Sequence, residues 1–236
     1  MNPEETPAPT NRPGDDADQT AVLFDIDGTL VDSNYLHIDA WDRAFASVGH
    51  PVDVWRIHRA IGMDSSKLLE RLLGDAASEA GDAAKDEHSR LYMQTVDRLR
   101  AIAGARDLLH DLSGRGFRVV LATSAPQDEL DILLSVLDLG DAVDAVTSSE
   151  DVGTAKPDPD IIGVALDKAG VPAERAVMVG DSVWDIAAAE RAGVRSIGLL
   201  SGGFGRGELL DAGAAQVYDD VADLHRNLGT SPVVTA

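Results

Sequence analysis

The sequence predicts an α/β protein whose core is a parallel β-sheet and whose first strand is followed by an inserted helical domain. From residue 104 onward, short runs of strand-forming residues alternate with helical patterns. Strands separated by helices of about ten to fifteen residues favour a parallel sheet with right-handed crossover connections. Residues 33–101 show only helical patterns. The chain has 236 residues and is 44% hydrophobic, which suits one large domain or a core with an insertion.

These patterns divide the chain into a core, a helical cap and two tails. We expect the core to comprise residues 20–32 and 102–229, and the cap to comprise residues 33–101. Residues 1–19 contain several prolines and acids without hydrophobic periodicity, so a disordered acidic tail is expected there. Residues 230–236 are expected to form a flexible tail.

The individual elements are predicted from hydrophobic spacing and from the glycines and prolines that interrupt it. Asp64 or Ser65 is a suitable N-cap for the third cap helix. The predicted cap helices cover residues 35–48, 54–61, 67–73 and 82–101. The predicted core strands cover residues 21–26, 117–122, 143–147, 176–179, 194–198 and 215–218. The predicted core helices cover residues 105–114, 127–137, 160–169, 183–191 and 220–228.

The composition excludes several classes of function. A net charge of −21 repels nucleic acid and anionic membranes, so neither is expected as a partner. The chain has no cysteine, which excludes disulfides, thiolate metal sites and a cysteine nucleophile, and which fits a reducing cytoplasm. No apolar stretch approaches the roughly 18 residues of a membrane span, and the first residues do not resemble a secretory signal. We therefore expect a cytoplasmic protein.

The strongest chemical signal is the end of the first strand, where the string A-V-L-F-D-I-D-G-T-L-V-D-S occupies residues 21–33. Because side chains alternate along a strand, Asp25 and Asp27 would point the same way, and Gly28 then allows a sharp turn. Clustered carboxylates repel one another and are costly to bury, but a cation between them removes both costs. The dipeptide Asp-Gly alone is common where a strand ends in a turn. Such a boundary is a poor explanation for the whole pattern over residues 25–33.

Other polar residues follow later strands. The second strand ends in Thr123 and Ser124, and the strand over 176–179 leads to Asp181. Lys156 lies in the loop that precedes the helix predicted over residues 160–169. Ligands bind beyond the carboxyl ends of parallel strands, so these residues are expected at one edge. Each also has an ordinary structural explanation, as a helix cap, a turn residue or a surface lysine.

Brought together, these residues would form a site for phosphoryl transfer. Carboxylate oxygens suit Mg²⁺, a lysine supplies a compact positive charge, and Thr123 and Ser124 offer hydroxyl and amide donors. Asp25 could attack phosphorus to form an aspartyl-phosphate, while Asp27 acts first as acid and then as base.

The order of these motifs resembles the haloacid dehalogenase superfamily. Its four motifs match D-x-D-G-T at residues 25–29, Thr123, Lys156, and G-D-x-x-x-D at residues 180–185. The resemblance covers about residues 20–228 and implies a Rossmann-like core. The helical cap after the first motif is similar to the C1 cap of the phosphoglycolate phosphatase and β-phosphoglucomutase branch.

The resemblance also implies roles for the residues. Asp25 would be the nucleophile and Asp27 the acid/base. Mg²⁺ would be held by the Asp25 carboxylate, the Asp27 main-chain carbonyl and Asp181. Asp185 would lie in the outer shell of the metal or steady Lys156. Family members that act as dehalogenases or phosphonatases lack an acid two residues after the nucleophile, so Asp27 favours a phosphate ester as substrate.

Hydrolysis of a small phosphomonoester, similar to phosphoglycolate or a sugar phosphate, is the favoured activity. A phosphosugar mutase of the β-phosphoglucomutase type is the alternative. Mutases carry an arginine in the cap and a lysine after the second motif, where this chain has Ser65 and Pro126. A phosphate-binding module without catalysis is a third possibility.

The cap would choose the substrate, but the sequence says little about how. The cap residues that would contact the substrate are His37, Arg59 and Lys67, with His58 as a further candidate. For His58, Arg59 and Lys67, a solvated helix position is at least as good an explanation. His37 lies in a helix that resembles the corresponding mutase helix. The sequence does not distinguish a monomer from a homodimer.

Overall fold

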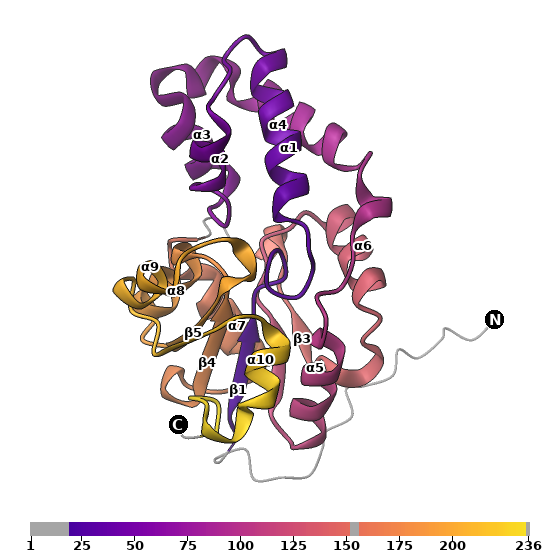
Figure 1. Ribbon diagram of the computed structural model, residues 1–236, viewed down its shortest axis with the longest axis vertical. Coiled ribbons are helices and arrows are strands. Elements are labelled where there is room, and N and C mark those ends of the chain that lie inside the picture. The colour runs from indigo at the N-terminus through magenta and orange to yellow at the C-terminus, as the bar shows by residue number, and fades with distance from the viewer. Residues whose placement is uncertain (1–18, 152–155, 235–236) are drawn as a thin grey trace, which may run out of the picture.

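The computed structural model describes residues 19–151 and 156–234 of the chain. The acidic tail expected over residues 1–19 lies outside the described residues, apart from Gln19, and so do residues 235 and 236 of the expected C-terminal tail. Figure 1 shows a central sheet with helices on both faces and a group of helices beyond one edge. This arrangement confirms the predicted α/β class.

The core contains one six-stranded parallel sheet with the strand order β3-β2-β1-β4-β5-β6. The first strand therefore lies in the middle, where neighbours on both sides pair with it. The strands are β1 (Ala21–Phe24), β2 (Arg118–Leu121), β3 (Ala145–Val146), β4 (Ala176–Gly180), β5 (Arg195–Leu199) and β6 (Gln216–Tyr218).

Helices cover both faces of this sheet, which explains why its central strands are continuous apolar runs. All four side chains of β1 are fully buried. Val22 and Phe24 belong to one hydrophobic cluster with residues of α5 (Ala105–Gly114), α6 (Gln127–Leu137) and α10 (Val221–Arg226). The alternate residues of β1 pack on the other face with α7 (Asp160–Ala169) and α8 (Val183–Arg191).

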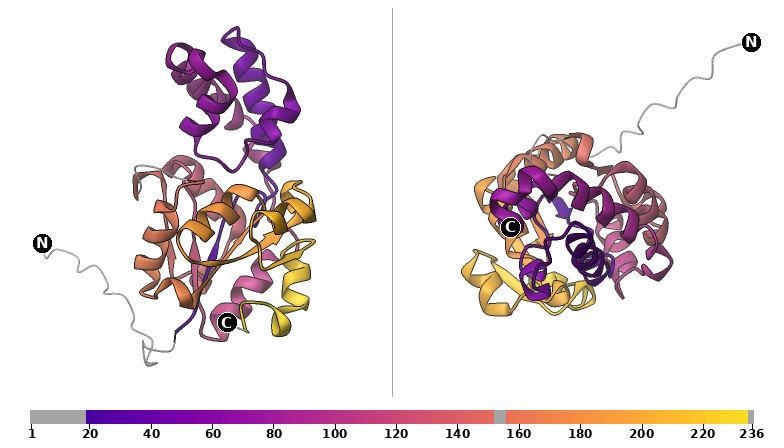
Figure 2. Two further views of the ribbon diagram at one scale, coloured as in Figure 1. Left: turned by 90° about the vertical axis from the view of Figure 1, so that its left-hand side faces the viewer. Right: turned by 90° about the horizontal axis from the view of Figure 1, so that it is seen from above.

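The cap residues form four helices between β1 and α5. Figures 1 and 2 show these helices grouped beyond the sheet, on the side to which β1 leads. Their bounds are α1 (Asn34–Ser47), α2 (Val54–His58), α3 (Ser65–Leu73) and α4 (Ala77–Tyr92). Asp64 caps α3 by accepting a hydrogen bond from the Ser66 N–H at 2.9 Å. None of the helices in the described part of the chain is long and apolar enough to cross a membrane.

The last cap helix differs from the prediction of one helix over residues 82–101. It begins earlier, in an alanine-rich stretch whose small buried residues pack against α1, and it ends at Tyr92. Both the N–H and the hydroxyl of Thr95 donate to the Tyr92 carbonyl at 2.8 Å. These local hydrogen bonds take the place of those that would continue the α-helix. A 3₁₀ turn over Val96–Arg98 follows. The core also contains α9 (Arg206–Asp211), which hydrophobic spacing did not predict.

The C-terminal segment also differs from the expected flexible tail over residues 230–236. A 3₁₀ turn covers Leu228–Thr230, and the Ser231 hydroxyl donates to the Leu228 carbonyl at 2.8 Å. Val233 is only 2% exposed and belongs to the main hydrophobic cluster. Burial of this one apolar side chain keeps the segment against the core as far as residue 233.

We predict that Val233→Ala lowers the free energy of unfolding by about 1–3 kcal/mol, because it removes two buried methyl groups and leaves a small cavity. Urea unfolding followed by circular dichroism measures the change. The matched control is Val234→Ala, since Val234 is 45% exposed and should change stability by less than about 0.5 kcal/mol. Equal effects of the two substitutions would contradict the packing described here.

Candidate active site

A cavity of about 370 Å³ lies between the carboxyl edge of the sheet and the cap. Five of the residues predicted from strand ends and loops line it together: Asp25, Asp27, Thr123, Ser124 and Lys156. They come from three segments that are far apart in the sequence. The parallel topology brings these segments to one edge, as the sequence analysis expected.

Lys156 supplies a buried positive charge at this edge of the sheet. Its side chain is buried, and its ammonium group forms ion pairs with Asp25 and, at 2.8 Å, with Asp185. Burial alone would lower the pKa of Lys156, but the two carboxylates outweigh it and raise that pKa. Asp185 therefore contacts the lysine, one of the two roles considered for it. Its other oxygen accepts hydrogen bonds from Ser182, which begins α8.

The carboxylates in the floor of the site outnumber the lysine. Burial raises the pKa of Asp25 to about 7, even though Lys156 acts in the opposite direction. Burial, together with repulsion from Asp185 and Asp25, raises the pKa of Asp181 well above its usual value. Carboxylate oxygens of Asp25, Asp181 and Asp185 lie within 4.8 Å of one another. This oxygen-rich, electron-rich donor set fits a hard divalent cation such as Mg²⁺.

Thr123 lines the cavity and is almost fully buried. Its oxygen accepts a hydrogen bond from the Ala125 N–H at 3.1 Å, which leaves the hydroxyl proton free to be donated. The Thr147 hydroxyl fixes the Thr123 backbone by donating to its carbonyl at 2.8 Å. The arrangement suits the predicted role of Thr123 as a donor to phosphate oxygens.

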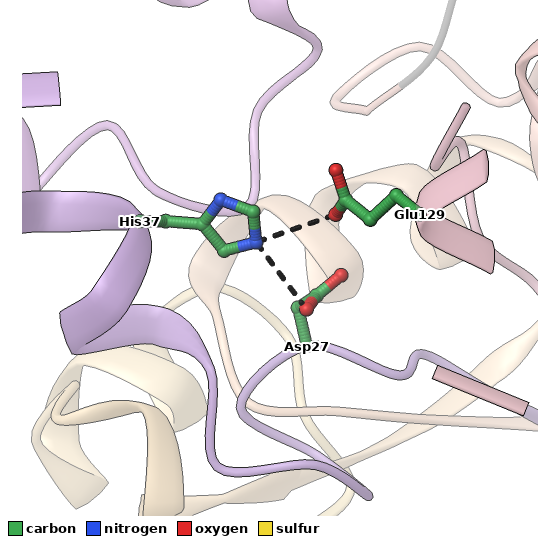
Figure 3. A group of neighbouring side chains, drawn as sticks. All are labelled: Asp27, His37 and Glu129. Carbon is green, nitrogen blue, oxygen red and sulfur yellow. Dashed lines mark ion pairs between the residues drawn. The ribbon is translucent and has the colours of Figure 1, made fainter. Parts of the chain in front are cut away.

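Asp27 belongs to a second polar group, which Figure 3 shows. Its carboxylate accepts a 2.5 Å hydrogen bond from the Ser33 hydroxyl and lies 3.4 Å from Nε2 of His37. The same nitrogen lies 3.4 Å from a carboxylate oxygen of Glu129. His37 comes from cap helix α1 and Glu129 from core helix α6, so this group joins the cap to the core.

In this group one imidazolium faces two carboxylates, whereas three carboxylates lie around Lys156. Burial opposes a charged imidazole, but Glu129 and Asp27 outweigh it and raise the pKa of His37 to about 10. Burial is likewise outweighed at Asp27, where His37 and Ser33 lower the pKa of the carboxyl group. Asp27, His37 and Glu129 could geometrically hold a cation. Because the imidazolium already supplies the positive charge, the cluster around Asp181 is the better metal site.

An aromatic stack holds the His37 ring in place. The Tyr92 ring lies parallel to it at a centroid distance of 3.8 Å, and the His88 ring stacks on Trp41 at 4.0 Å. Burial and the nearby His37 charge lower the pKa of His88 to about 2, so His88 is neutral. Nδ1 of protonated His37 therefore donates to Nε2 of His88 at 3.1 Å. His37 lines the cavity as predicted, but both of its ring nitrogens already have partners.

Two of the other cap residues predicted to contact the substrate, Arg59 and Lys67, do not line this cavity. Arg59 pairs with Glu208 of the core and lies 4.3 Å above the Phe204 ring. Lys67 pairs with Asp158 at 3.0 Å. Arg59 therefore connects the cap to core helix α9, and Lys67 connects it to the turn that precedes α7. The cap residues that do line the cavity include Trp41, Ser65, Ser66, Lys85 and Ser89.

Similarity to known proteins agrees with this geometry. A family of hydrolases described as haloacid dehalogenase-like matches residues 19–193. The chain belongs to this family. The match includes Asp25, Asp27, Thr123, Lys156 and Asp181, the residues that meet at the carboxyl edge of the sheet.

Individual relatives of this hydrolase cover most of its length. It is 34% identical over 219 residues to a phosphoglycolate phosphatase from Rhodospirillum rubrum, covering 89% of this chain and 90% of that protein. It is 30% identical over 200 residues to a phosphorylated carbohydrates phosphatase from Thermotoga maritima, covering 82% and 91% respectively. The structure of a hydrolase from Pseudomonas syringae, 36% identical, superposes with a TM-score of 0.85, covering 90% of this chain and 99% of that one.

The charge of His37 predicts a pH-dependent contribution to stability. A pKa raised to about 10 in the folded state means that His37 stabilises the fold fully below about pH 6.5, the usual histidine value. This contribution is lost as the pH rises from there through about 10. In EDTA, we expect the difference in unfolding free energy between wild type and His37→Gln to shrink from pH 6.5 to pH 10.

Urea unfolding at pH 6.5, 8 and 10 measures this difference. The matched control is His50→Gln, because His50 is exposed. A difference between wild type and His37→Gln that stays constant over this range would show that His37 is not held as an imidazolium.

Proposed function

We propose that the protein is a Mg²⁺-dependent phosphatase that hydrolyses a small phosphomonoester through an aspartyl-phosphate intermediate. The observation that carries the proposal is the buried pair of Asp25 and Lys156 at the floor of the cavity, with Asp27 two residues further on. A nucleophile, a cation for phosphate oxygens and an acid/base group are thereby present within one site.

In the first step, a carboxylate oxygen of Asp25 attacks phosphorus and the bond to the leaving oxygen breaks. Lys156 and Thr123 stabilise the charge on the equatorial oxygens. Asp27 gives its proton to the leaving group. In the free protein Asp27 is held ionised, but a phosphoryl dianion entering the cavity raises its pKa by like-charge repulsion and favours the protonated form.

In the second step, water attacks the phosphorus of the aspartyl-phosphate. Asp27, now ionised, accepts the proton from this water. Cleavage of the bond between phosphorus and the Asp25 oxygen releases inorganic phosphate and regenerates the free carboxylate. The contacts of Asp27 with Ser33 and His37 stabilise its ionised form, which suits this role as base.

The residues that would hold Mg²⁺ are Asp25, the main-chain carbonyl of Asp27, and Asp181. Bound there, the cation would neutralise the carboxylates and polarise a phosphate oxygen. The excess of buried carboxylates around a single lysine supports this assignment.

The cap supports the choice of hydrolysis over mutase activity. Ser65 and Pro126 line the cavity at the two positions where mutases of this branch carry a cation. One cap cation, Lys85, also lines the cavity, so the two activities need a direct test. The named activities of the relatives from Rhodospirillum rubrum and Thermotoga maritima support phosphoglycolate or a sugar phosphate as the class of substrate.

We also propose that the cap closes over the cavity as a unit, with hinges near Ser33 and Gly104, and that its cavity-lining residues select the leaving group. The absence of cysteine supports a cytoplasmic setting for this chemistry. The acidic composition gives no support for nucleic acid or membranes as partners.

We predict that Asp25→Asn lowers kcat by at least ~10²-fold, because the attacking oxygen and a metal ligand are lost together. Release of inorganic phosphate from a panel of phosphomonoesters measures the effect, and thermal unfolding confirms that the variant is folded. The control is Asp53→Asn, an exposed cap residue that does not line the cavity. If Asp25→Asn kept more than about a tenth of the wild-type kcat, Asp25 would not be the nucleophile.

A second experiment separates phosphatase, mutase and binding module. The enzyme is incubated with β-glucose 1-phosphate and a trace of the 1,6-bisphosphate, with Mg²⁺ or with excess EDTA, and products are followed by phosphorus NMR. We expect inorganic phosphate with Mg²⁺ and no reaction with EDTA. Accumulation of glucose 6-phosphate without inorganic phosphate would identify a mutase. No turnover of this or any other panel member with Mg²⁺ would favour a non-catalytic module.

A further inference from the structure

Asn34, the first residue of cap helix α1, contacts Asp181 of the core. Its side-chain amide donates to Oδ2 of Asp181 at 2.8 Å. The Thr29 hydroxyl donates to the other oxygen, Oδ1, at 2.9 Å. All three residues are buried, and Asn34 is only 3% exposed. Each oxygen of this carboxylate therefore has one neutral donor, and the two bonds together determine the orientation of the carboxylate plane.

The backbone leaves little room for Asp181 to turn. A Cβ atom added to Gly28 would lie 2.2 Å from the Asn34 amide nitrogen and 2.5 Å from Oδ2 of Asp181. A Cβ atom added to Gly202 would lie 1.7 Å from the same oxygen. Two glycines thus allow the main chain to approach the carboxylate closely. The Asp181 side chain is confined by these backbones as well as by its two donors.

Asn34 also has an unused polar atom. Because a carboxylate accepts hydrogen bonds, the nitrogen of the amide must face Asp181 and the oxygen must face away. This oxygen, Oδ1, is buried and has no hydrogen-bond partner among the described residues. Asn34 lines the cavity. A buried amide oxygen without a partner is costly, and because its residue lines the cavity, a donor that enters the cavity would offset this cost.

Helix stability does not explain an asparagine at this position. Ser33 is the N-cap of α1, and no side chain caps the helix. Asn has a lower helix propensity than Ala, so Ala would favour the helix by several tenths of a kcal/mol. The side chain of Asn34 therefore contributes to the site rather than to the helix that contains it.

We propose that Asn34 is a positioning residue for the divalent cation: it acts through Asp181, and its free carbonyl oxygen accepts a hydrogen bond from a water or substrate hydroxyl in the cavity. This inference rests on the proposed metal site. Partners that orient a metal-binding carboxylate commonly change metal affinity by about 10- to 100-fold. Loss of the Asn34 amide should produce an effect of that size.

The test is calorimetric titration of Mg²⁺ into metal-free protein. We expect Asn34→Ala and Thr29→Val each to weaken Mg²⁺ binding by about 10- to 100-fold. Asn227→Ala is the matched control, because Asn227 is exposed, its side chain bonds to Asp223, and it does not line the cavity. This variant should bind Mg²⁺ as wild type does. Thermal unfolding in EDTA should show that all variants are folded, and Asn34→Ser is a second variant if Asn34→Ala is not.

A kinetic measurement separates the free oxygen of Asn34 from its amide. At Mg²⁺ concentrations that saturate each variant, Thr29→Val should regain the wild-type KM for the phosphomonoester. Asn34→Ala should keep a raised KM, because it alone removes an acceptor inside the cavity. Recovery of the wild-type KM by both variants would refute the role of the free oxygen.

The calorimetry also separates this inference from the proposed function. Wild-type Mg²⁺ affinity in both Asn34 variants, with weakened binding in Thr29→Val, would overturn the role of Asn34 and leave the metal site intact. Failure of the wild-type protein to bind Mg²⁺ would overturn the metal site and the inference together.

Discussion

Two of three buried carboxylates pair with the buried ammonium group of Lys156 and the third does not, and the active-site end of the protein depends on this imbalance. Lys156 pairs with Asp25 and Asp185, which would otherwise lie desolvated beside like charges. Asp181 has only the neutral donors Thr29 and Asn34 among the described residues, and its pKa is raised accordingly. Folding thus creates a local excess of negative charge, and the proposed cation site depends on the same packing that forms the cavity.

Topology made most of this site predictable. The parallel register aligns Phe24 of β1 with Val179 of β4, so Asp25 and Asp181 follow adjacent strands with an offset of one residue. Only the order of the elements is needed to expect this, and the apolar runs and their helical spacers specify that order. Thr123 reaches the same edge for the same reason, because β2 is the neighbour of β1 on the other side.

The partners of individual side chains were not predictable in this way. Glu129 and Asn34 carry no local signal, since their roles depend on distances across elements that only the folded chain determines. Arg59 and Lys67 have acidic partners, Glu208 and Asp158, that are distant in the sequence, so spacing could not show that they lie outside the cavity lining. The same limit applies to Val233, whose apolar side chain has no periodic neighbours to indicate burial.

The contacts that join cap and core have a consequence for behaviour in different salts. The Arg59 and Lys67 ion pairs are both about a third or more exposed, so dissolved ions screen them. The Asp64 N–H, which donates to the Lys156 carbonyl at 2.9 Å, is a neutral contact that salt screens little. Higher ionic strength should therefore weaken the two ion pairs and leave the hydrogen bond between Asp64 and Lys156 in place. Under the proposed closure of the cap, the openness of the cavity would then depend on the surrounding electrolyte.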